Sequence, residues 1–463
     1  MKSFFARFFG ALSPAAWVIV ALAVGSSIGV ALVRATPRRG LQFWIFAVNH
    51  EPFYRAVVAD WNREHPDKPV QISLVNVTAL EQRMMSSFFS GTPIADVLEV
   101  ERSIVGPAFA GPLPSVGFVD LTDRLRQQDL LERINHPSFS PWTSRGRIFG
   151  IPHDVHPVLL AYRADLVEAA GIDMSRIQTW DDYFRMLAPL MKSPGGSGPV
   201  DRYLINGWPS DYYTAEMLLL QAGGALFDAH ERPTLNSAFN ARFIARLATW
   251  YTGPHRVARS LDYFSASGHQ MMLQGQIVGL LVPDWYAGLI LKPEMPGLAG
   301  KMKLMPLPAW EPGGRRTSAW GGTMLAIAKS SARQQEAWDF AQFLYLSPTT
   351  AVALFRGDGI VSPIKSFWSN PVYDEPDPYF CGQHFGRLFL DQASNVPMRT
   401  SSPYNQQALT AFDNCLIDVT AYADRTGRYD PAPLVPEAQR LLDGAQRQIA
   451  DQIARNVFLT AAP

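Results

Sequence analysis

The sequence predicts a mixed α/β protein of two lobes that follow an apolar N-terminal segment. At 463 residues the chain is longer than one average domain. From residue 41 onward, apolar runs of strand length alternate with helical patterns, which is typical of a parallel sheet covered by helices. A polar stretch at 152–157 has a proline at each end and apolar runs on both sides, which favours a crossing between two lobes. A proline-rich surface loop is the alternative for that stretch.

Charge and cysteine content narrow the functional classes. The 41 basic and 41 acidic residues cancel, which removes the usual argument for nucleic acid or an anionic membrane surface as partner. Cys381 and Cys415 are too few for a disulfide framework or a cysteine-rich zinc site. They either pair in an oxidising compartment or are two unrelated buried thiols. The 12 tryptophans suit a cleft that stacks on flat apolar faces, although core packing accounts for most tryptophans in proteins.

The N-terminal segment, residues 1–39, is predicted to direct the chain to a membrane. Residues 15–33 carry no charge, and basic residues flank them on both sides. This stretch approaches the ~20 residues of a membrane-spanning helix and exceeds the roughly 7–15 of a signal-peptide core. We therefore expect an uncleaved signal anchor that holds the large following domain at the periplasmic face of the cytoplasmic membrane. Cleavage after Ala35, which would release a soluble periplasmic protein, is the alternative.

The first predicted elements place polar residues where strands end. Residues 41–47 form a dense apolar run that suits a strand buried on both faces. A second strand is predicted at 70–77, and a helix follows at 80–90. Ligands of open α/β sheets bind beyond the carboxyl ends of the strands. The candidate cleft residues at such positions are Asn49, His50, Glu99 and Glu101.

Aromatic and acidic residues gather at two places in the second half of the chain. Trp208, Asp211 and Tyr212 crowd a turn before an apolar helix, where they either contact a ligand or staple the start of the helix. Asp284 and Trp285 directly follow an apolar run of strand length. Both places are therefore candidates for a binding site.

Two further patterns predict helices, and a third concerns the approach of a ligand. Thr179 begins a predicted helix that has Asp182 at its third position, which is the pattern of a capping box. A long amphipathic helix is predicted at 435–457. Trp320 precedes a pair of glycines, which would let the backbone approach a ligand closely.

Several motifs resemble one family. G-x-I-x-G-I-P at 146–152, followed by L-x-Y-x-x-D-L at 160–166, resembles the family 1 extracellular solute-binding proteins of ABC importers, of the maltodextrin-binding type. Other family-like segments follow in the family's order and spacing. They are V-D-L-T-D at 119–123, A-G-I and T-W-D at 170–181, an M-x-x-G-to-W element at 271–285, G-G-x-x-L-A-I at 321–327, A-W-D-F-x-x-F-L at 337–344, and a Y-F-G-G-Q-like segment at 379–383 in which Cys381 replaces a glycine. The resemblance covers roughly residues 41–457.

This resemblance implies a type II periplasmic-binding-protein-like fold with three hinge crossings near 152–157, 304–308 and 357–363. The first lobe would contain 40–153 and 306–356, and the second 154–305 and 357–463. The expected function is to bind a carbohydrate, an oligosaccharide above all, between the lobes and to deliver it to an ABC permease. No enzymatic activity and no cofactor are expected.

The resemblance also implies site residues. In the family, a tryptophan after the corresponding strand stacks on a sugar ring, and Trp285 holds that position here. The other expected stacking aromatics are Trp208, Tyr212 and Trp320, with Gly321 and Gly322 at the ligand's edge. The residues expected to hydrogen-bond sugar hydroxyls are Asn49, His50, Glu99, Glu101, Asp154, His156, Asp211, Asp284 and Arg356.

Two alternatives involve other ligands or chemistry. A glycerol-phosphate receptor of the same fold would need arginines in the cleft, and the candidates are Arg102, Arg163 and Arg356. A glycoside hydrolase would need paired carboxylates, for which Glu99, Glu101, Asp154 and Asp284 are available. A third alternative is an interaction protein that kept the fold and lost its ligand.

The motifs of several enzyme classes are missing. The sequence contains no phosphate-binding loop, no zinc-protease helix motif and no esterase elbow. Metal binding by His153, Asp154 and His156 would require a bend, because strand alternation places His153 on the opposite face from the other two. We therefore expect no metal.

Overall fold

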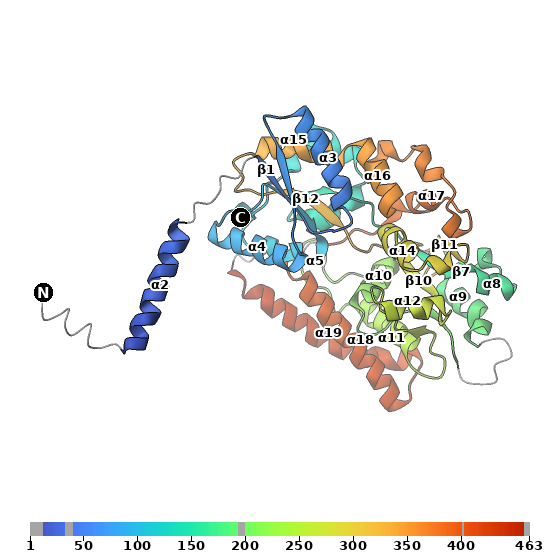
Figure 1. Ribbon diagram of the computed structural model, residues 1–463. Helices are drawn as coiled ribbons and strands as arrows, with labels where there is room; N and C mark the ends of the chain where they lie inside the picture. The colour runs from blue at the N-terminus through green and yellow to red at the C-terminus, as the bar shows by residue number, and fades with distance from the viewer. Residues whose placement is uncertain (1–12, 33–39, 193–199, 401, 458–463) are drawn as a thin grey trace, which may run out of the picture. The chain divides into compact units, whose positions relative to one another are not determined.

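A computed structural model describes residues 13–32, 40–192, 200–400 and 402–457 of the chain (Figure 1). The chain divides into two units, 1–40 and 41–463. The first unit contains helix α2 (Pro14–Leu32), which includes most of the predicted anchor. None of the described helices combines the length and the apolarity that crossing a membrane requires, so the anchor is not confirmed. Val33 and the alternative cleavage position after Ala35 lie outside the described residues.

The first sheet of the second unit has the strand order β2-β1-β3-β12-β6. Its strands are β1 (Leu41–Ile45), β2 (Val70–Leu74), β3 (Val97–Glu101), β6 (Ile151–Pro152) and β12 (Thr323–Ile327). β1 runs parallel to β2 and β3, whereas β12 runs antiparallel to β3 and β6. Leu325 and Ile327 enter one core, and Met324 and Ala326 enter another. Because side chains alternate along a strand, this sheet is buried on both faces.

The second sheet has the strand order β11-β7-β10-β8-β9. Its strands are β7 (Val158–Arg163), β8 (Tyr203–Asn206), β9 (Ala258–Arg259), β10 (Ile277–Pro283) and β11 (Met302–Pro306). β7 is antiparallel to β10 and β11, and β10 is parallel to β8. Every residue of β7 and β10 is buried. A short hairpin, β4 (Thr143–Ser144) and β5 (Arg147–Ile148), stands apart from both sheets.

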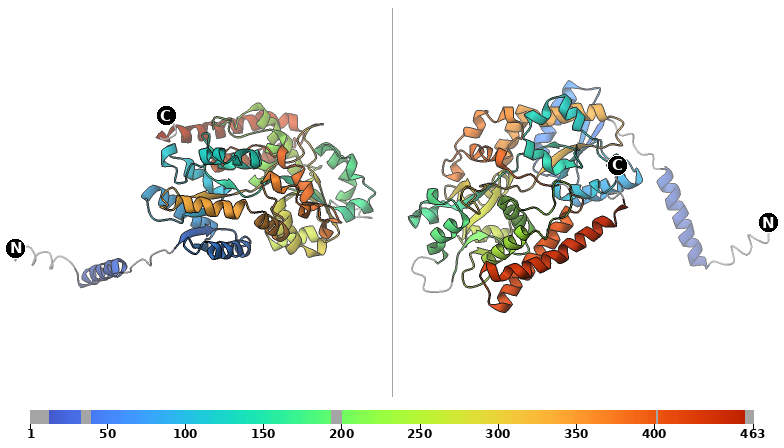
Figure 2. Two further views of the ribbon diagram at one scale, coloured as in Figure 1. Left: turned by 90° about the horizontal axis from the view of Figure 1, so that it is seen from above. Right: turned by 180° about the vertical axis from the view of Figure 1, so that it is seen from behind.

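Helices cover the sheets. Their bounds are α3 (Glu51–Glu64), α4 (Val77–Ser90), α5 (Arg102–Val105), α6 (Thr122–Gln127), α7 (Leu130–Arg133), α8 (Ala164–Ala169), α9 (Trp180–Leu187), α10 (Tyr212–Ala222), α11 (Ala238–Tyr251), α12 (Ala266–Leu273), α13 (Asp284–Tyr286), α14 (Lys292–Glu294), α15 (Gln334–Tyr345), α16 (Pro348–Asp358), α17 (Phe385–Leu390), α18 (Asn405–Thr426) and α19 (Pro431–Ala454). α3 and α15 share a core with one face of the first sheet, and α4 shares a core with the other. α11, α18 and α19 pack on one another and join the core of the second sheet (Figure 2).

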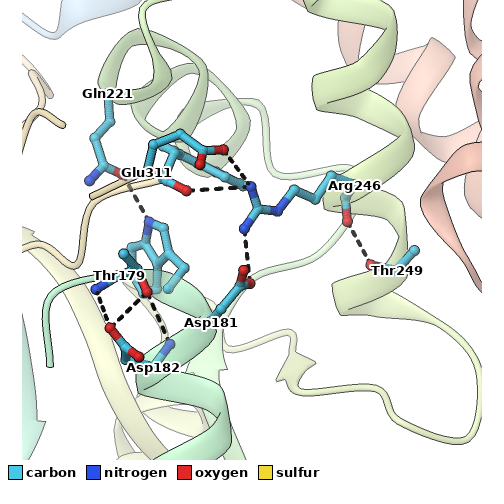
Figure 3. A network of polar contacts seen from close by, with 9 residues as sticks. Thr179, Asp181, Asp182, Gln221, Arg246, Thr249 and Glu311 are labelled. Atoms are coloured by element: carbon cyan, nitrogen blue, oxygen red, sulfur yellow. Dashed lines mark hydrogen bonds and ion pairs between the residues drawn. The ribbon is translucent and has the colours of Figure 1, made fainter. Parts of the chain in front are cut away.

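Helix starts follow the local sequence. The predicted capping box at α9 is confirmed, since Thr179 Oγ1 accepts from the Asp182 amide at 3.2 Å and the Asp182 carboxylate accepts from the Thr179 amide at 3.1 Å (Figure 3). α4 begins at Val77, three residues earlier than predicted, because the Asn76 side chain accepts from the Thr78 amide and caps the helix there.

Polar contacts bind the loop after β11 to the helices of the second sheet (Figure 3). Arg246 of α11 lies 2.9 Å from Asp181 of α9 and 3.5 Å from Glu311 of the loop. Gln221 of α10 donates to the Pro308 carbonyl at 2.7 Å. The loop therefore stays with the second sheet beyond β11.

Within the described residues, three passages lead from one sheet to the other, and one of them differs from expectation. The first follows β6 and ends at β7, as expected for 152–157. The third lies near 360–372, where Ile360 and Ile364 pack in a core of the first sheet and Val361 and Val372 pack in that of the second. The second lies after Trp320 and not at 304–308, because Trp310 and Trp320 still pack in the core of the second sheet.

Both cysteines are free, so the disulfide alternative is wrong. Cys415 is buried, whereas Cys381 is exposed. Cys381 has a φ of 56°, in the left-handed region that glycine adopts most easily. The family-like segment thus keeps its turn although the glycine is replaced.

We expect Gly288→Ala to destabilise the protein by about 2 kcal/mol, since added volume at a tight contact typically costs about 1–3 kcal/mol. A Cβ on Gly288 would lie 2.1 Å from the backbone oxygen of Asp358, at the third passage. Urea unfolding measures the loss. The control is Gly444→Ala in α19, where a Cβ would meet nothing within 4 Å and stability is expected to stay or rise. Equal midpoints for wild type and Gly288→Ala would contradict this close contact.

Candidate functional site

A cavity of about 250 Å³ lies between residues of the two sheets. Its wall combines aromatic rings with polar side chains. The aromatic residues are Phe46, Tyr213, Phe264, Trp285 and Trp320. The polar ones are His50, Glu101, Arg102, Ser103, His153, Asp154, Thr323 and Gln406. The remaining wall residues are Ala47, Leu289, Gly321, Gly322 and Ile360.

The aromatic wall is a packed cluster of rings. Trp285 meets Trp320 edge to face with centroids 5.2 Å apart, and lies parallel to Phe264 at 6.4 Å. The Trp285 ring nitrogen donates to the Trp320 carbonyl at 3.3 Å. Trp320 is only 3% exposed, so it mainly supports the wall, whereas the half-buried Trp285 presents more surface to the cavity. Such a wall suits the flat apolar face of a ligand.

The glycine pair beside Trp320 is required by protein contacts. Gly321 has a φ of 80°, and a Cβ there would lie 2.7 Å from the Trp285 ring nitrogen. Gly322 has a φ of 127°, and its Cβ would lie 2.9 Å from the His156 ring. Both glycines line the cavity. The close approach that the sequence predicted is therefore, in this structure, an approach to Trp285 and His156.

Glu99 holds His50 in place behind the polar wall. Its carboxylate lies 2.6 Å from His50 Nδ1 and accepts from the Phe46 amide at 3.2 Å. Burial alone would lower the pKa of His50, but the charge and hydrogen bond of Glu99 outweigh it and raise that pKa. Glu99 is fully buried and does not line the cavity. It positions a wall residue and offers no atom to the cavity itself.

Two acidic residues do reach the cavity. Glu101 caps α5 by accepting from the Ser103 amide at 2.8 Å, and burial raises its pKa against these hydrogen bonds. Asp154 contacts His156, and burial together with the nearby Asp284 charge raises its pKa well above the ordinary value. Each carboxylate thus keeps acceptor atoms near the ligand space.

Asp284 and His156 support the cavity from behind. Asp284 is fully buried, accepts from the Val361 amide at 2.9 Å, and does not line the cavity. Burial raises its pKa to about 7. His156 is 1% exposed and lies against Gly322. Both had been expected to contact ligand, but packing at the passages between the sheets encloses them.

Four other expected residues lie away from the cavity. Asn49 is exposed and Trp208 is 40% exposed, both outside the wall. Asp211 caps α10 and accepts from the Thr214 hydroxyl at 2.5 Å. Arg356 is exposed and donates to Glu375 at 2.7 Å. The side chain of Tyr212 lies outside the described residues, and the next residue, Tyr213, lines the cavity.

The sequence signals for the overlooked wall residues differ. Phe46 directly follows β1, and Arg102 and Ser103 directly follow β3, so the ends of these strands could have indicated them. Phe264 and Gln406 come from distant segments with no motif. His153 had been considered only as a metal ligand.

The geometry bears on the alternative ligands. Of the three arginines a phosphate would need, Arg102 is paired with Glu216, Arg163 with Asp165 and Arg356 with Glu375. Of the four carboxylates considered for hydrolysis, only Glu101 and Asp154 line the cavity.

Comparison with known proteins identifies the family. The model of the family described as bacterial extracellular solute-binding protein matches residues 47–350, which is more than half of the chain. An arabinooligosaccharide-binding protein of Halalkalibacterium halodurans is 25% identical over 88% of this chain and 90% of its own length. A protein of the same name from Bacillus subtilis is 26% identical over 73% of this chain and 76% of its own.

Solved structures agree on the fold. The sugar-binding protein MalE of Xanthomonas citri superposes with a TM-score of 0.72 at 20% identity, covering 91% of this chain and all of that one. An ABC transporter associated binding protein of B. animalis subsp. lactis, in complex with β-1,6-galactobiose, has a TM-score of 0.64 at 20% identity and covers 91% of this chain and 99% of its own. The chain therefore belongs to the bacterial extracellular solute-binding protein family, as its motifs predicted.

Proposed function

We propose that this protein is the substrate-binding component of an ABC importer and binds a carbohydrate in the cavity between its two sheets. The observation that carries the proposal is a wall that combines aromatic rings, among them Trp285 and Phe264, with the polar side chains of His50, Glu101 and Asp154. A sugar ring has an apolar face that stacks on aromatic rings and a rim of hydroxyls that exchange hydrogen bonds with polar side chains. The names of the two curated relatives, both arabinooligosaccharide-binding proteins, support an oligosaccharide ligand.

The proposed mechanism is hinge closure about the three passages between the sheets. The first sheet contributes Glu101 to the cavity, and the helix that follows the second sheet's β10 contributes Trp285. A ligand contacts both sides only when they are close together, so its binding energy favours the closed arrangement. Delivery to a permease then follows from recognition of that arrangement.

The N-terminal segment is proposed to bring the protein to the outside of the cytoplasmic membrane. Residues 15–33 lack charge and have basic flanks, which is typical of an export signal. Both retention as an anchor and cleavage after Ala35 fit a periplasmic or extracellular receptor, the location that the family's description implies.

Thermal unfolding with a panel of ligands tests the function. The panel contains arabino- and malto-oligosaccharides, galactobiose and glycerol 3-phosphate. A ligand at about 100 times its Kd is expected to add roughly 2.7 kcal/mol of stability. A rise with a sugar that is recovered chemically intact supports the receptor and excludes hydrolysis. Stabilisation by glycerol 3-phosphate alone would contradict the carbohydrate function. So would a panel in which no ligand raises the stability.

A further inference from the structure

The sugar cavity is the first of three adjoining hollows, and the last of them is a larger groove. The cavity of about 250 Å³ shares Arg102 with a small junction hollow of about 40 Å³, which Glu216 and Arg399 also line. The junction hollow shares Arg399, Met398 and Thr400 with a groove of about 1120 Å³. Shared wall residues make the three hollows neighbours in this order.

An ion pair stands between the cavity and the junction hollow. Arg102 begins α5, directly after β3 of the first sheet, and Glu216 belongs to α10 beside the second sheet. Arg102 Nη1 donates to Glu216 Oε2 at 2.9 Å, and Nη2 donates to Oε1. The two side chains are 11% and 8% exposed. The pair thus forms a bidentate ion pair between the two sides of the cleft.

A gain in folding stability does not explain why this ion pair is buried here. Removing two charges from water costs about as much as their attraction returns, so a buried ion pair stabilises a fold weakly or not at all. A planar, bidentate contact nevertheless fixes the position of both side chains. The pair is therefore well suited to shape a wall.

Arg399, which lines the junction hollow and contacts Gly321 of the cavity wall, carries an unused hydrogen-bond donor. Arg399 is 6% exposed, and its Nη2 donates to the Gly321 carbonyl at 2.6 Å. Its Nη1 is buried and has no hydrogen-bond partner within the part of the chain that the structure describes. Leaving such a donor unpaired costs free energy, which a ligand hydroxyl at this place would recover.

We propose that the Arg102–Glu216 pair is the end wall of the sugar cavity and sets the length of the ligand. This inference rests on the proposed carbohydrate function. With the pair in place the cavity is smaller than the roughly 300 Å³ at which drug-sized sites begin, and it admits one or two sugar rings. Without the pair, a longer chain extends past Arg399 toward the groove.

The test measures affinity against ligand length by calorimetry, with mono- to tetrasaccharides of the arabino and malto series. The full-length wild type is expected to gain no affinity beyond the disaccharide. Arg102→Ala/Glu216→Ala is expected to bind tri- and tetrasaccharides about tenfold more tightly than wild type, because an added ring gains contacts. Because Arg102 also lines the cavity, mono- and disaccharide affinity is expected to fall. The length profile is therefore read as the ratio of tetrasaccharide to disaccharide affinity, which is expected to rise at least about tenfold over wild type.

Two control variants test whether the Arg102–Glu216 pair acts as an end wall or in another way. The swap Arg102→Glu/Glu216→Arg rebuilds an ion pair and is expected to restore the wild-type length profile. Arg163→Ala/Asp165→Ala removes a pair that lines none of the three hollows and is expected to leave the profile unchanged. Thermal unfolding of each variant shows whether it is folded.

Three outcomes would overturn the proposal. Equal weakening at every length in the double alanine variant would make the pair a latch between the two sides. A wild type that gains affinity with each added ring up to the tetrasaccharide would show that no wall ends the cavity. Failure of the wild type to bind either series would overturn the carbohydrate function itself, and the length inference with it.

Discussion

Trp285→Ala is expected to weaken sugar binding by about 2 kcal/mol, which is roughly 30-fold in Kd. Trp285 is the half-buried tryptophan of the cavity wall, and its ring is parallel to Phe264 and braced edge to face by Trp320. Such bracing holds the ring ready for stacking, so little entropy is lost when a ligand binds. Calorimetric titration with the best sugar of the thermal panel measures the loss.

The chain offers a matched control for this substitution. Trp208 has the same side chain but is 40% exposed and does not line the cavity. Trp208→Ala is therefore expected to leave sugar affinity unchanged. If Trp285→Ala binds as tightly as wild type, or if both variants lose the same affinity, then the aromatic wall does not stack on the ligand.

Asp284→Asn is expected to remove a large pH dependence of stability. Burial raises the pKa of Asp284 from 3.8 to about 7. Between these pH values the folded chain holds a proton that the unfolded chain releases, so the free energy of unfolding falls as pH rises. Each unit of pKa difference corresponds to about 1.4 kcal/mol, so the fall is on the order of a few kcal/mol by pH 8 and is shared with the neighbouring Asp154, whose pKa is also raised.

Asparagine at this position is neutral at every pH and still accepts from the Val361 amide, which Asp284 binds at 2.9 Å. We expect wild type and Asp284→Asn to unfold with similar free energies near pH 4, and the variant to be more stable at pH 8. Urea titrations at the two pH values measure both. The exposed Asp67→Asn serves as control and is expected to change neither. A constant difference across this range would contradict an uncharged Asp284 in the fold.

Local patterns predicted much of the architecture because they reflect local forces. The capping box at Thr179 depends on residues three apart, and the apolar run predicted at 41–47 contains β1, whose Leu41, Phe43 and Ile45 are buried in a core. Trp285 could be placed because it directly follows a strand and a motif marks it. Such features can be predicted without knowing which distant segments of the chain contact one another.

The composition of the cavity wall depended on tertiary packing. Tyr213 of α10 lines the cavity, and the helical pattern alone did not single it out, because packing decides which face of a helix meets a cavity. Glu99 and Glu101 share one side of β3, yet Glu99 is enclosed with His50, whereas Glu101 stands at the strand's open end.

Long-range contacts decided the rest. Phe264 and Gln406 are far apart in the sequence, and no pattern links them before the fold brings both to the cavity. The passage after Trp320 lies later than expected, since Arg246 and Gln221 hold the loop after β11 to the second sheet. Residue types and spacing thus determined the family, many of the elements and the place of one tryptophan, Trp285, in the cavity wall. The burial and the orientation of a side chain depend on all of its neighbours together. Only the tertiary structure therefore decided which residues line the cavity.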